Sequence, residues 1–139
     1  MVVASRVRRM HPFRKAVEAR DLAAIDRLLA DDVVFTSPVA FKPYEGKAIT
    51  SAILATVIEV FEDFRYAREY GEKGVRGHAL MFEAKVAGKA ITGCDFIRTD
   101  SDGLINDFMV MVRPLSAAQA LSEQMAARFD DIVRRASGS

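Results

Sequence analysis

The 139-residue chain has one cysteine, no tryptophan and no excess of charge of either sign. A single cysteine, Cys94, cannot form an internal disulfide, which favours a reducing compartment, so the predicted location is the cytoplasm. Twenty Lys and Arg against nineteen Asp and Glu give a formal net charge of +1. That balance leaves little positive charge to hold a phosphate backbone, and we expect no nucleic-acid partner.

Long hydrophobic runs are also missing. The longest apolar stretch, Ala52–Ile58, is far shorter than the roughly 20 residues that a membrane-spanning helix needs, so no membrane partner is expected. The opening residues, Met1–Arg9, contain three arginines, but the apolar segment of a secretory signal does not follow them. We interpret residues 1–10 as a loose N-terminal segment.

The chain is rich in soft apolar side chains. Half of its residues are hydrophobic, with nine Phe and six Met. A chain of this length supports one hydrophobic core, so we expect a single domain over residues 11–135 and a frayed tail over 136–139. The few polar residues inside such a core are the candidates for function.

Three segments space their apolar residues as helices do. Residues 13–29 are interrupted at Arg20 and Asp21, and Asp21 is placed to cap a second helix there. Residues 49–61 predict another helix. Residues 118–132 predict one C-terminal helix, with Ser116 as its cap.

The remaining segments read as sheet. Asp31 and Asp32 end the preceding helical pattern. Val33–Thr36 then predicts a short strand before Pro38, and 41–46 predict a loop. Alternating side chains predict four further strands joined by turns: 64–70, 79–86, 89–99 and 104–113. The order predicts an α+β domain in which N-terminal helices pack on a strongly curved antiparallel sheet, followed by a C-terminal helix.

This order resembles the cone-shaped domain of the nuclear transport factor 2-like superfamily, which includes the ketosteroid isomerases and the SnoaL-like polyketide cyclases. The resemblance covers about Phe13 to Arg113. It implies a deep apolar pocket inside the curled sheet and a second subunit against the outer sheet face. The segments that carry it are Val17–Ile25, Ala30–Val39, Tyr44–Lys47, Cys94–Arg98 and Asp102–Ile105.

Ketosteroid isomerases use a tyrosine and a protonated aspartic acid as donors to the developing oxyanion, and a second aspartate that moves the proton. Matched by motif, the oxyanion acid falls on Asp95. The tyrosine falls on Phe13 and the proton-moving aspartate on Ser37. Phe13 cannot donate a hydrogen bond and an unassisted Ser37 is no base near neutral pH, so standard ketosteroid isomerase chemistry is not expected.

Asp95 is the first candidate catalytic residue. Strand alternation places it on the face of Ile91, Gly93 and Ile97, which the resemblance turns toward the pocket. Poor solvation there would raise its pKa and suit it to act as a donor, acid or base. The alternative is that Asp95 only bonds a polar neighbour, such as His78 or a water.

His78 is the second candidate. By alternation with Leu80 and Phe82 it could point inward and form an acid–base pair with Asp95. The alternative, which we favour, is a histidine at a solvated strand end. With only His11 and His78 in the chain and no carboxylate at ligand spacing, neither a metal site nor a cofactor is expected.

The predicted ligand-binding residues are mostly apolar side chains on the expected pocket face and its mouth, namely Phe13, Phe35, Ser37, Tyr44, Phe82, Ile91, Gly93, Phe108 and Val110. On the opposite face of the last strand lie Met109 and Met111, so both faces are apolar and a homodimer through the outer face is expected. A C-terminal helix covering these methionines in a monomer is the alternative.

Two kinds of function remain open. The first is cofactor-independent isomerase, cyclase or hydrolase chemistry on a small hydrophobic molecule, with Asp95 as acid or base. The second is a non-catalytic module for ligand binding or dimerisation. A buried carboxyl at Asp95 favours the first, and the replacements at Phe13 and Ser37 favour the second.

Overall fold

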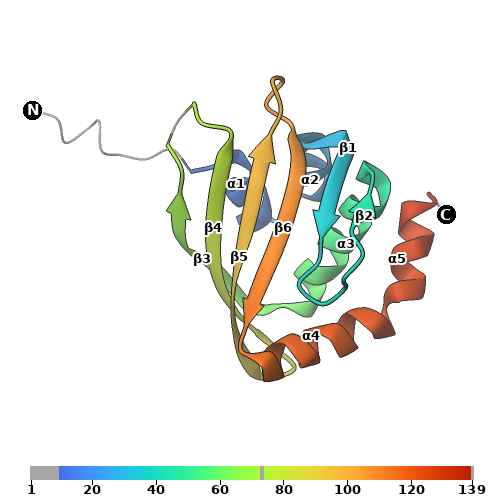
Figure 1. Cartoon of the computed structure of the whole chain (residues 1–139). Helices are drawn as coiled ribbons and strands as arrows, with labels where there is room; N and C mark the ends of the chain where they lie inside the picture. The colour runs from blue at the N-terminus through green and yellow to red at the C-terminus, as the bar shows by residue number, and fades with distance from the viewer. Residues whose placement is uncertain (1–9, 73, 139) are drawn as a thin grey trace, which may run out of the picture.

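Five helices and a six-stranded, curled but unclosed sheet form the domain, seen in the computed structural model of Figure 1. The structure describes residues 10–72 and 74–138. The expected loose segment 1–10 therefore lies outside the described residues, apart from Met10. The α+β prediction is confirmed. In the described part of the chain, no helix has the length and apolar character to cross a membrane.

Two short helices open the described chain, α1 (Pro12–Glu18) and α2 (Leu22–Leu28). Pro12 suits the first turn because that position needs no backbone donor. The interruption at Arg20 follows the prediction, and the Asp21 carboxylate accepts a hydrogen bond from the backbone N–H of Ala24 at 3.1 Å. This cap begins α2 and directs its buried residue, Ile25, into the core.

The first strand begins earlier than the sequence pattern indicated. β1 spans Leu29–Thr36, so Asp31 and Asp32 do not end a helix but lie exposed within the strand. The register of β1 against its neighbour shifts between Leu29 and Val34, and such a bulge lets two polar residues face solvent while the flanking residues stay buried.

A second, short strand follows where the sequence predicted only a loop. β2 (Tyr44–Glu45) pairs with β1, and α3 (Lys47–Val60) follows after Gly46. The glycine adopts φ of 106°, a left-handed conformation that other residues rarely take. The buried side of α3 faces the concave side of the sheet.

The four long strands are β3 (Glu62–Tyr70), β4 (Gly77–Val86), β5 (Lys89–Thr99) and β6 (Ile105–Arg113). The strand order is β2-β1-β6-β5-β4-β3. All neighbouring pairs are antiparallel except β1 and β6, which run parallel. That parallel contact joins the N-terminal strand to the end of the meander and places Phe35 beside Phe108.

The C-terminal region is two helices, not the one predicted. α4 spans Leu115–Ala127 and α5 spans Phe129–Ala136. The N–H of Arg128 bonds the carbonyl of Met125 at 3.1 Å, while its guanidinium bonds the carbonyl of Gln124 at 2.9 Å, and this breaks the helical ladder. Ser116 lies inside α4 and Pro114 occupies the cap position, so the predicted cap is wrong.

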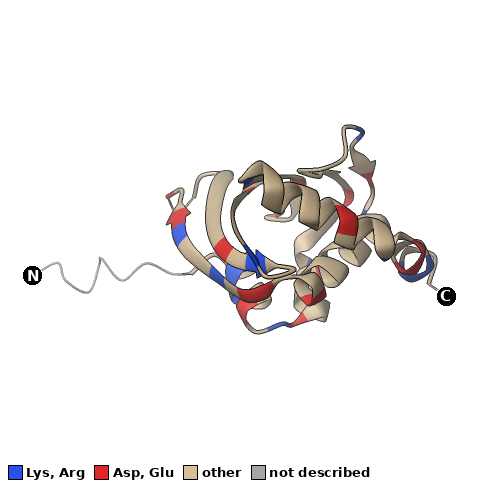
Figure 2. Ribbon diagram, turned by 90° about the horizontal axis from the view of Figure 1, so that it is seen from below, with Lys and Arg blue, Asp and Glu red and all other residues tan. Residues whose placement is uncertain are grey.

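The helices close the open side of the curled sheet. In Figure 1 the sheet lies in front of α1, α2 and α3, and α4 runs below its lower end toward α5. The end view of Figure 2 shows the strands bending around the interior and α4 crossing that end. α4 contacts β5, β6 and α3, while α5 packs on α3. The interior is therefore walled by sheet on one side and by helices on the others.

Candidate functional site

A narrow cavity lies inside the curl. It offers about 70 Å³ of space to the centre of a water molecule. Of its lining side chains only Ser37, Tyr66 and Asp95 carry polar groups. The remaining lining residues are apolar: Phe13, Val17, Phe35, Pro38, Val39, Ile53, Leu54, Val57, Ile58, Phe61, Phe64, Phe82, Val110, Leu121 and Met125.

A hydrogen bond between Tyr66 and Asp95 forms the polar centre of this cavity. The Tyr66 hydroxyl donates to Asp95 Oδ2 at 2.7 Å, and each residue is only 6% exposed. The two side chains come from strands that are not neighbours, because Tyr66 lies on β3 and Asp95 pairs with Leu80 of the intervening β4. The tyrosine therefore reaches across β4 beneath the curl of the sheet.

Burial controls the protonation of this pair. Desolvation raises the pKa of Asp95 from 3.8 to about 7, and the hydrogen bond from Tyr66 acts in the opposite direction without restoring the ordinary value. Desolvation, and then the nearby Asp95 carboxylate, raise the pKa of Tyr66 well above 10. Near neutral pH the carboxyl is thus divided between its acid and its ionised form, while the tyrosine stays protonated.

Aromatic rings build the wall next to the pair. Phe64 stacks on Phe61 with centroids 5.6 Å apart and on Phe82 at 5.0 Å. The Tyr66 ring meets Phe64 edge-on at 4.9 Å. These contacts hold the tyrosine in one orientation and keep the surroundings of the carboxyl apolar.

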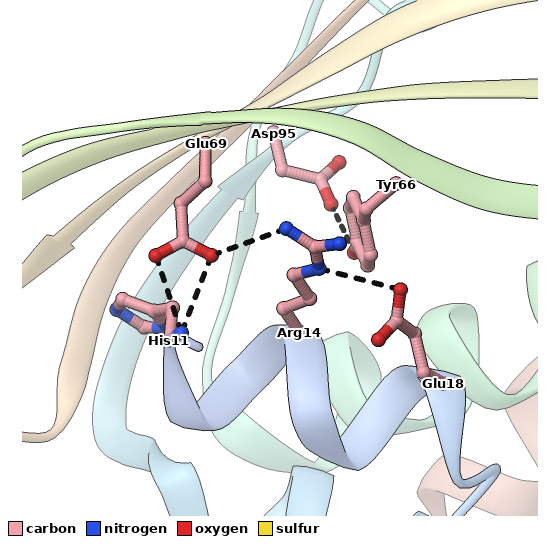
Figure 3. A network of polar contacts seen from close by, with 6 residues as sticks. All are labelled: His11, Arg14, Glu18, Tyr66, Glu69 and Asp95. Carbon is pink, nitrogen blue, oxygen red and sulfur yellow. Dashed lines mark hydrogen bonds and ion pairs between the residues drawn. The ribbon is translucent and has the colours of Figure 1, made fainter. Parts of the chain in front are cut away.

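On the side of Tyr66 toward α1, a polar network joins that helix to β3 (Figure 3). The backbone N–H of His11 donates to the Glu69 carboxylate at 3.2 Å, and Arg14 lies 3.6 Å from Glu69 and 3.3 Å from Glu18. In Figure 3 the Arg14 guanidinium lies beside Tyr66. The network fixes α1 against β3 and with it Phe13, which lines the cavity.

The structure brings one group of predicted residues together at the cavity. Its lining includes Asp95 with Phe13, Phe35, Ser37, Phe82 and Val110. The Ser37 hydroxyl accepts a hydrogen bond from the backbone N–H of Val39 at 3.1 Å, which leaves its proton free to donate. These six residues remain the candidates for contact with a ligand.

Five predicted residues do not line it: His78, Tyr44, Ile91, Gly93 and Phe108. Ile91 and Phe108 are core residues with 2% and 0% exposure. The Tyr44 ring packs against Phe35 with centroids 6.5 Å apart. The space above Gly93 is not open to a ligand, because the Phe82 ring occupies it.

His78 forms no pair with Asp95, whose hydrogen-bond partner is Tyr66. The His78 ring packs edge-on against His11 with centroids 4.7 Å apart, at the end of β4. Its Nδ1 is buried without a hydrogen-bond partner among the described residues. Burial and His78 lower the pKa of His11, against the opposing effect of Glu69.

Tyr66 is the site residue that the sequence analysis missed. Its alternation with Phe64 indicated a shared face, but periodicity does not say which residue on another strand it meets. A register shift between Tyr66 and Arg68 then turns Glu69 inward and leaves Tyr70 half exposed, so regular alternation does not continue to the end of β3. Pairing the predicted strands would have been the signal, since it sets Tyr66 opposite Phe82.

Among residues 10–72 and 74–138, no group of three or more His, Cys, Asp or Glu side chains is arranged to hold a metal ion. The cavity itself offers one carboxylate, which is too few ligands for a stable divalent site.

Comparison with known proteins supports the fold. A family model described as a SnoaL-like domain matches residues 7–108. A steroid delta-isomerase from Pseudomonas aeruginosa shares 45% sequence identity with a TM-score of 0.81, covering 87% of this chain and 88% of that chain. A search of curated proteins gives no match.

Two further solved structures are similar. A protein with a cystatin-like fold from Silicibacter pomeroyi shares 36% identity with a TM-score of 0.82, covering 88% of this chain and 86% of that chain. A nuclear transport factor 2-like protein from Cytophaga hutchinsonii has a TM-score of 0.57 at 18% identity, covering 74% and 85%, which shows the fold alone.

The raised pKa of Asp95 predicts a specific pH dependence of stability. A carboxyl whose pKa is higher in the folded than in the unfolded chain binds more protons when folded, so the free energy of unfolding falls as pH rises from about 4 to about 7 and then levels off. Three pKa units correspond to on the order of 4 kcal/mol. The Asp95→Asn variant, which does not titrate at this position, should lack that fall.

Urea unfolding at a series of pH values measures the difference. Asp107→Asn is the matched control, because Asp107 is exposed on neighbouring β6. If the difference in unfolding free energy between the wild type and Asp95→Asn stays constant from pH 4 to pH 8, the claim that burial raises the pKa of Asp95 is refuted.

Proposed function

The chain belongs to the SnoaL-like domain family, and from that premise we propose that it binds a small, uncharged and largely apolar molecule whose carbonyl or enol oxygen is held by Asp95. The carboxyl acts in its protonated form as a hydrogen-bond donor to that oxygen. The reaction that this supports is a cofactor-independent proton shift or ring closure at a carbon next to the carbonyl.

The observation that carries this proposal is the buried Asp95 carboxyl at an otherwise apolar cavity. Tyr66 occupies Oδ2, so Oδ1 is the oxygen left for the ligand. A protonated carboxyl donates a stronger hydrogen bond to an enolate-like oxygen than to the ketone before reaction, because negative charge develops on that oxygen in the transition state. The apolar walls exclude water and strengthen this contact.

Tyr66 supports Asp95 in this role. Its hydroxyl fixes the plane of the carboxyl, and its high pKa keeps it a donor. The resemblance places an oxyanion tyrosine at Phe13, which here has no hydroxyl. We infer that Tyr66 acts through Asp95 and does not replace that tyrosine directly, since its proton is directed to Oδ2.

A base for the carbon-bound proton is the missing element. The resemblance places it at Ser37, and no ionisable side chain other than Asp95 and Tyr66 lines the cavity. This observation favours a second candidate function, a binding module without catalysis. The relative from Pseudomonas aeruginosa described as a steroid delta-isomerase nevertheless makes isomerisation the first reaction to test.

We further propose that the chain is a homodimer through the outer face of β5 and β6. Cys94 pairs with Met111 and Phe96 with Met109 across these strands. Phe96 is 40% and Met111 56% exposed, which leaves an apolar strip open on the sheet. Cys94 is unpaired, which fits the proposed cytoplasmic location.

Phenol tests the binding step, because its hydroxyl resembles that of an enol. Asp95→Asn should weaken phenol binding by about 10-fold, since the amide N–H that replaces the acid O–H is a weaker donor to the ligand oxygen. Wild-type affinity for cyclohexanone, whose carbonyl oxygen can only accept, should fall as pH rises above about 7, because the ionised carboxylate cannot donate. Titration followed by NMR measures both.

Toluene is the matched ligand, since it keeps the ring and lacks the hydroxyl. Its affinity should not change in Asp95→Asn, and Asp107→Asn should change neither affinity. If Asp95→Asn loses affinity for phenol and for toluene equally, Asp95 supports the shape of the cavity without recognising the oxygen.

Restoring the base tests catalysis. Ser37→Asp should raise the rate of converting 3-cyclohexenone to the conjugated 2-cyclohexenone by about 10²-fold, the usual contribution of a positioned general base. The new carboxylate can accept the same Val39 N–H that the serine hydroxyl accepts now. The reaction moves one proton within the substrate and is followed by the ultraviolet absorbance of the conjugated ketone.

Ser37→Asn is the control, because asparagine has the shape of aspartate without its negative charge. A rate for Ser37→Asp no higher than that for Ser37→Asn would contradict the assignment of position 37, and a fast wild-type reaction would show that Asp95 needs no second base.

The dimer is tested by Met111→Glu, which places a charge on the proposed interface. Sedimentation should show a dimer for the wild type and a monomer for the variant. Val133→Glu alters an apolar residue of similar exposure on α5 and should remain dimeric. A monomeric wild type would refute the homodimer, and a dimeric Met111→Glu would place the subunit contact on another face.

A further inference from the structure

We propose that Phe82, lying across Gly93, determines the size of the ligand and restricts it to about one ring or a short chain bearing a carbonyl or hydroxyl group. This inference rests on the proposed function and names the substrate class of the same cavity. Phe82 is the specificity-determining residue, and Gly93 is the residue that positions it.

Register and close approach identify the pair. Phe82 of β4 stands directly opposite Gly93 of β5 on the concave face. A Cβ added at Gly93 would lie 2.7 and 2.9 Å from Phe82 Cε2 and Cε1, and closer still to Cζ. The tip of the ring therefore occupies the space where any other residue at position 93 would have its side chain.

Neighbouring rings hold Phe82 in this position. Its ring centroid lies 5.0 Å from Phe64, 5.4 Å from Phe61 and 6.4 Å from Tyr66. Phe82 itself is 1% exposed. The ring is thus enclosed between the backbone of β5 and the aromatic wall, and it forms a fixed boundary of the cavity.

The size of the cavity sets the ligand class. A volume of about 70 Å³ is roughly half that of a cavity of about 150 Å³ that holds one benzene ring. Pockets that enclose drug-sized ligands commonly measure about 300–1,000 Å³. The present cavity therefore accepts at most about one six-membered ring carrying one oxygen, whereas a fused polycyclic molecule requires the Phe82 ring to leave its place.

Gly93 controls this boundary through Phe82. Replacing Gly93 with alanine requires the ring tip to lift from β5 by more than a few tenths of an ångström. Phe61 and Phe64 close the outward side, so the ring moves into the cavity and fills it. The Gly93→Ala variant should therefore bind ligands of every size more weakly than the wild type does.

The test is a series of phenols of increasing ring number, phenol, 2-naphthol and the steroid estradiol, bound to the full chain and followed by NMR or calorimetry. Wild type should bind phenol and bind estradiol at least about 10-fold more weakly. Phe82→Ala should reverse this order. Phe82→Leu, which removes less volume and is the milder change to the core, should move the preference from phenol toward 2-naphthol.

Phe108→Leu is the matched control. Phe108 is fully buried on neighbouring β6, and it packs against Phe13 and Phe35 without lining the cavity. This variant loses the same atoms from the core and should leave the order of the three phenols unchanged. A shift equal to that of Phe82→Leu would mean that general loosening, and not the cavity boundary, changes ligand size.

The double variant Gly93→Ala with Phe82→Leu separates a specific from a structural role. If Gly93 acts through the Phe82 ring, shortening the ring should restore phenol binding to within about 10-fold of the wild type. Failure of this rescue in a folded double variant would overturn the role of Gly93.

The outcomes also distinguish this inference from the function on which it rests. If the wild type binds estradiol more tightly than phenol, and Asp95→Asn weakens the binding of both, the size limit is overturned while the role of Asp95 stands. A size order that follows Phe82 while Asp95→Asn changes no affinity would keep the size limit and refute the proposed function.

Discussion

The hydrogen bond from Tyr66 to Asp95 is the interaction on which the interior of this domain depends. A carboxyl enclosed by apolar side chains is strongly disfavoured as an unpaired ion, so it must either stay protonated or be hydrogen-bonded. Here both conditions contribute, because Tyr66 donates at 2.7 Å and burial raises the pKa of Asp95 to about 7. The curl of the sheet is what makes the bond possible, since the tyrosine must cross an entire strand to reach its partner.

The rest of the cavity follows from keeping that pair dry. Phe61, Phe64 and Phe82 wall one side, and Leu121 and Met125 of α4 close the end. The ion pairs of Arg14 with Glu18 and Glu69 lie on the side of Tyr66 toward α1, so strong charge comes close to the tyrosine but does not line the cavity. The result is a cavity lined by one group that titrates near neutral pH, Asp95, which suits recognition of a single oxygen on an uncharged ligand.

Local sequence patterns were sufficient for most of the fold and for part of the site. Apolar spacing predicted α3, the Asp21 side chain predicted the start of α2, and alternation placed Asp95 on the inner face. These features depend on residues close in sequence. The features that were missed depend on contacts between distant residues: the break at Arg128, the bulge that keeps Asp31 and Asp32 within β1, and the partnership of Asp95 with Tyr66, 29 positions away.

The central claim is that burial in the folded domain raises the pKa of Asp95 to about 7, so that a large share of the carboxyl stays protonated near neutral pH. Carbon-13 NMR of aspartate-labelled protein, with the Asp95 carboxyl resonance assigned from its absence in Asp95→Asn, measures its titration directly. The account predicts a midpoint of about 7, rising further in Tyr66→Phe because that variant removes the bond that favours the ionised form. A midpoint of about 4, the ordinary value for an exposed aspartate, would contradict the account.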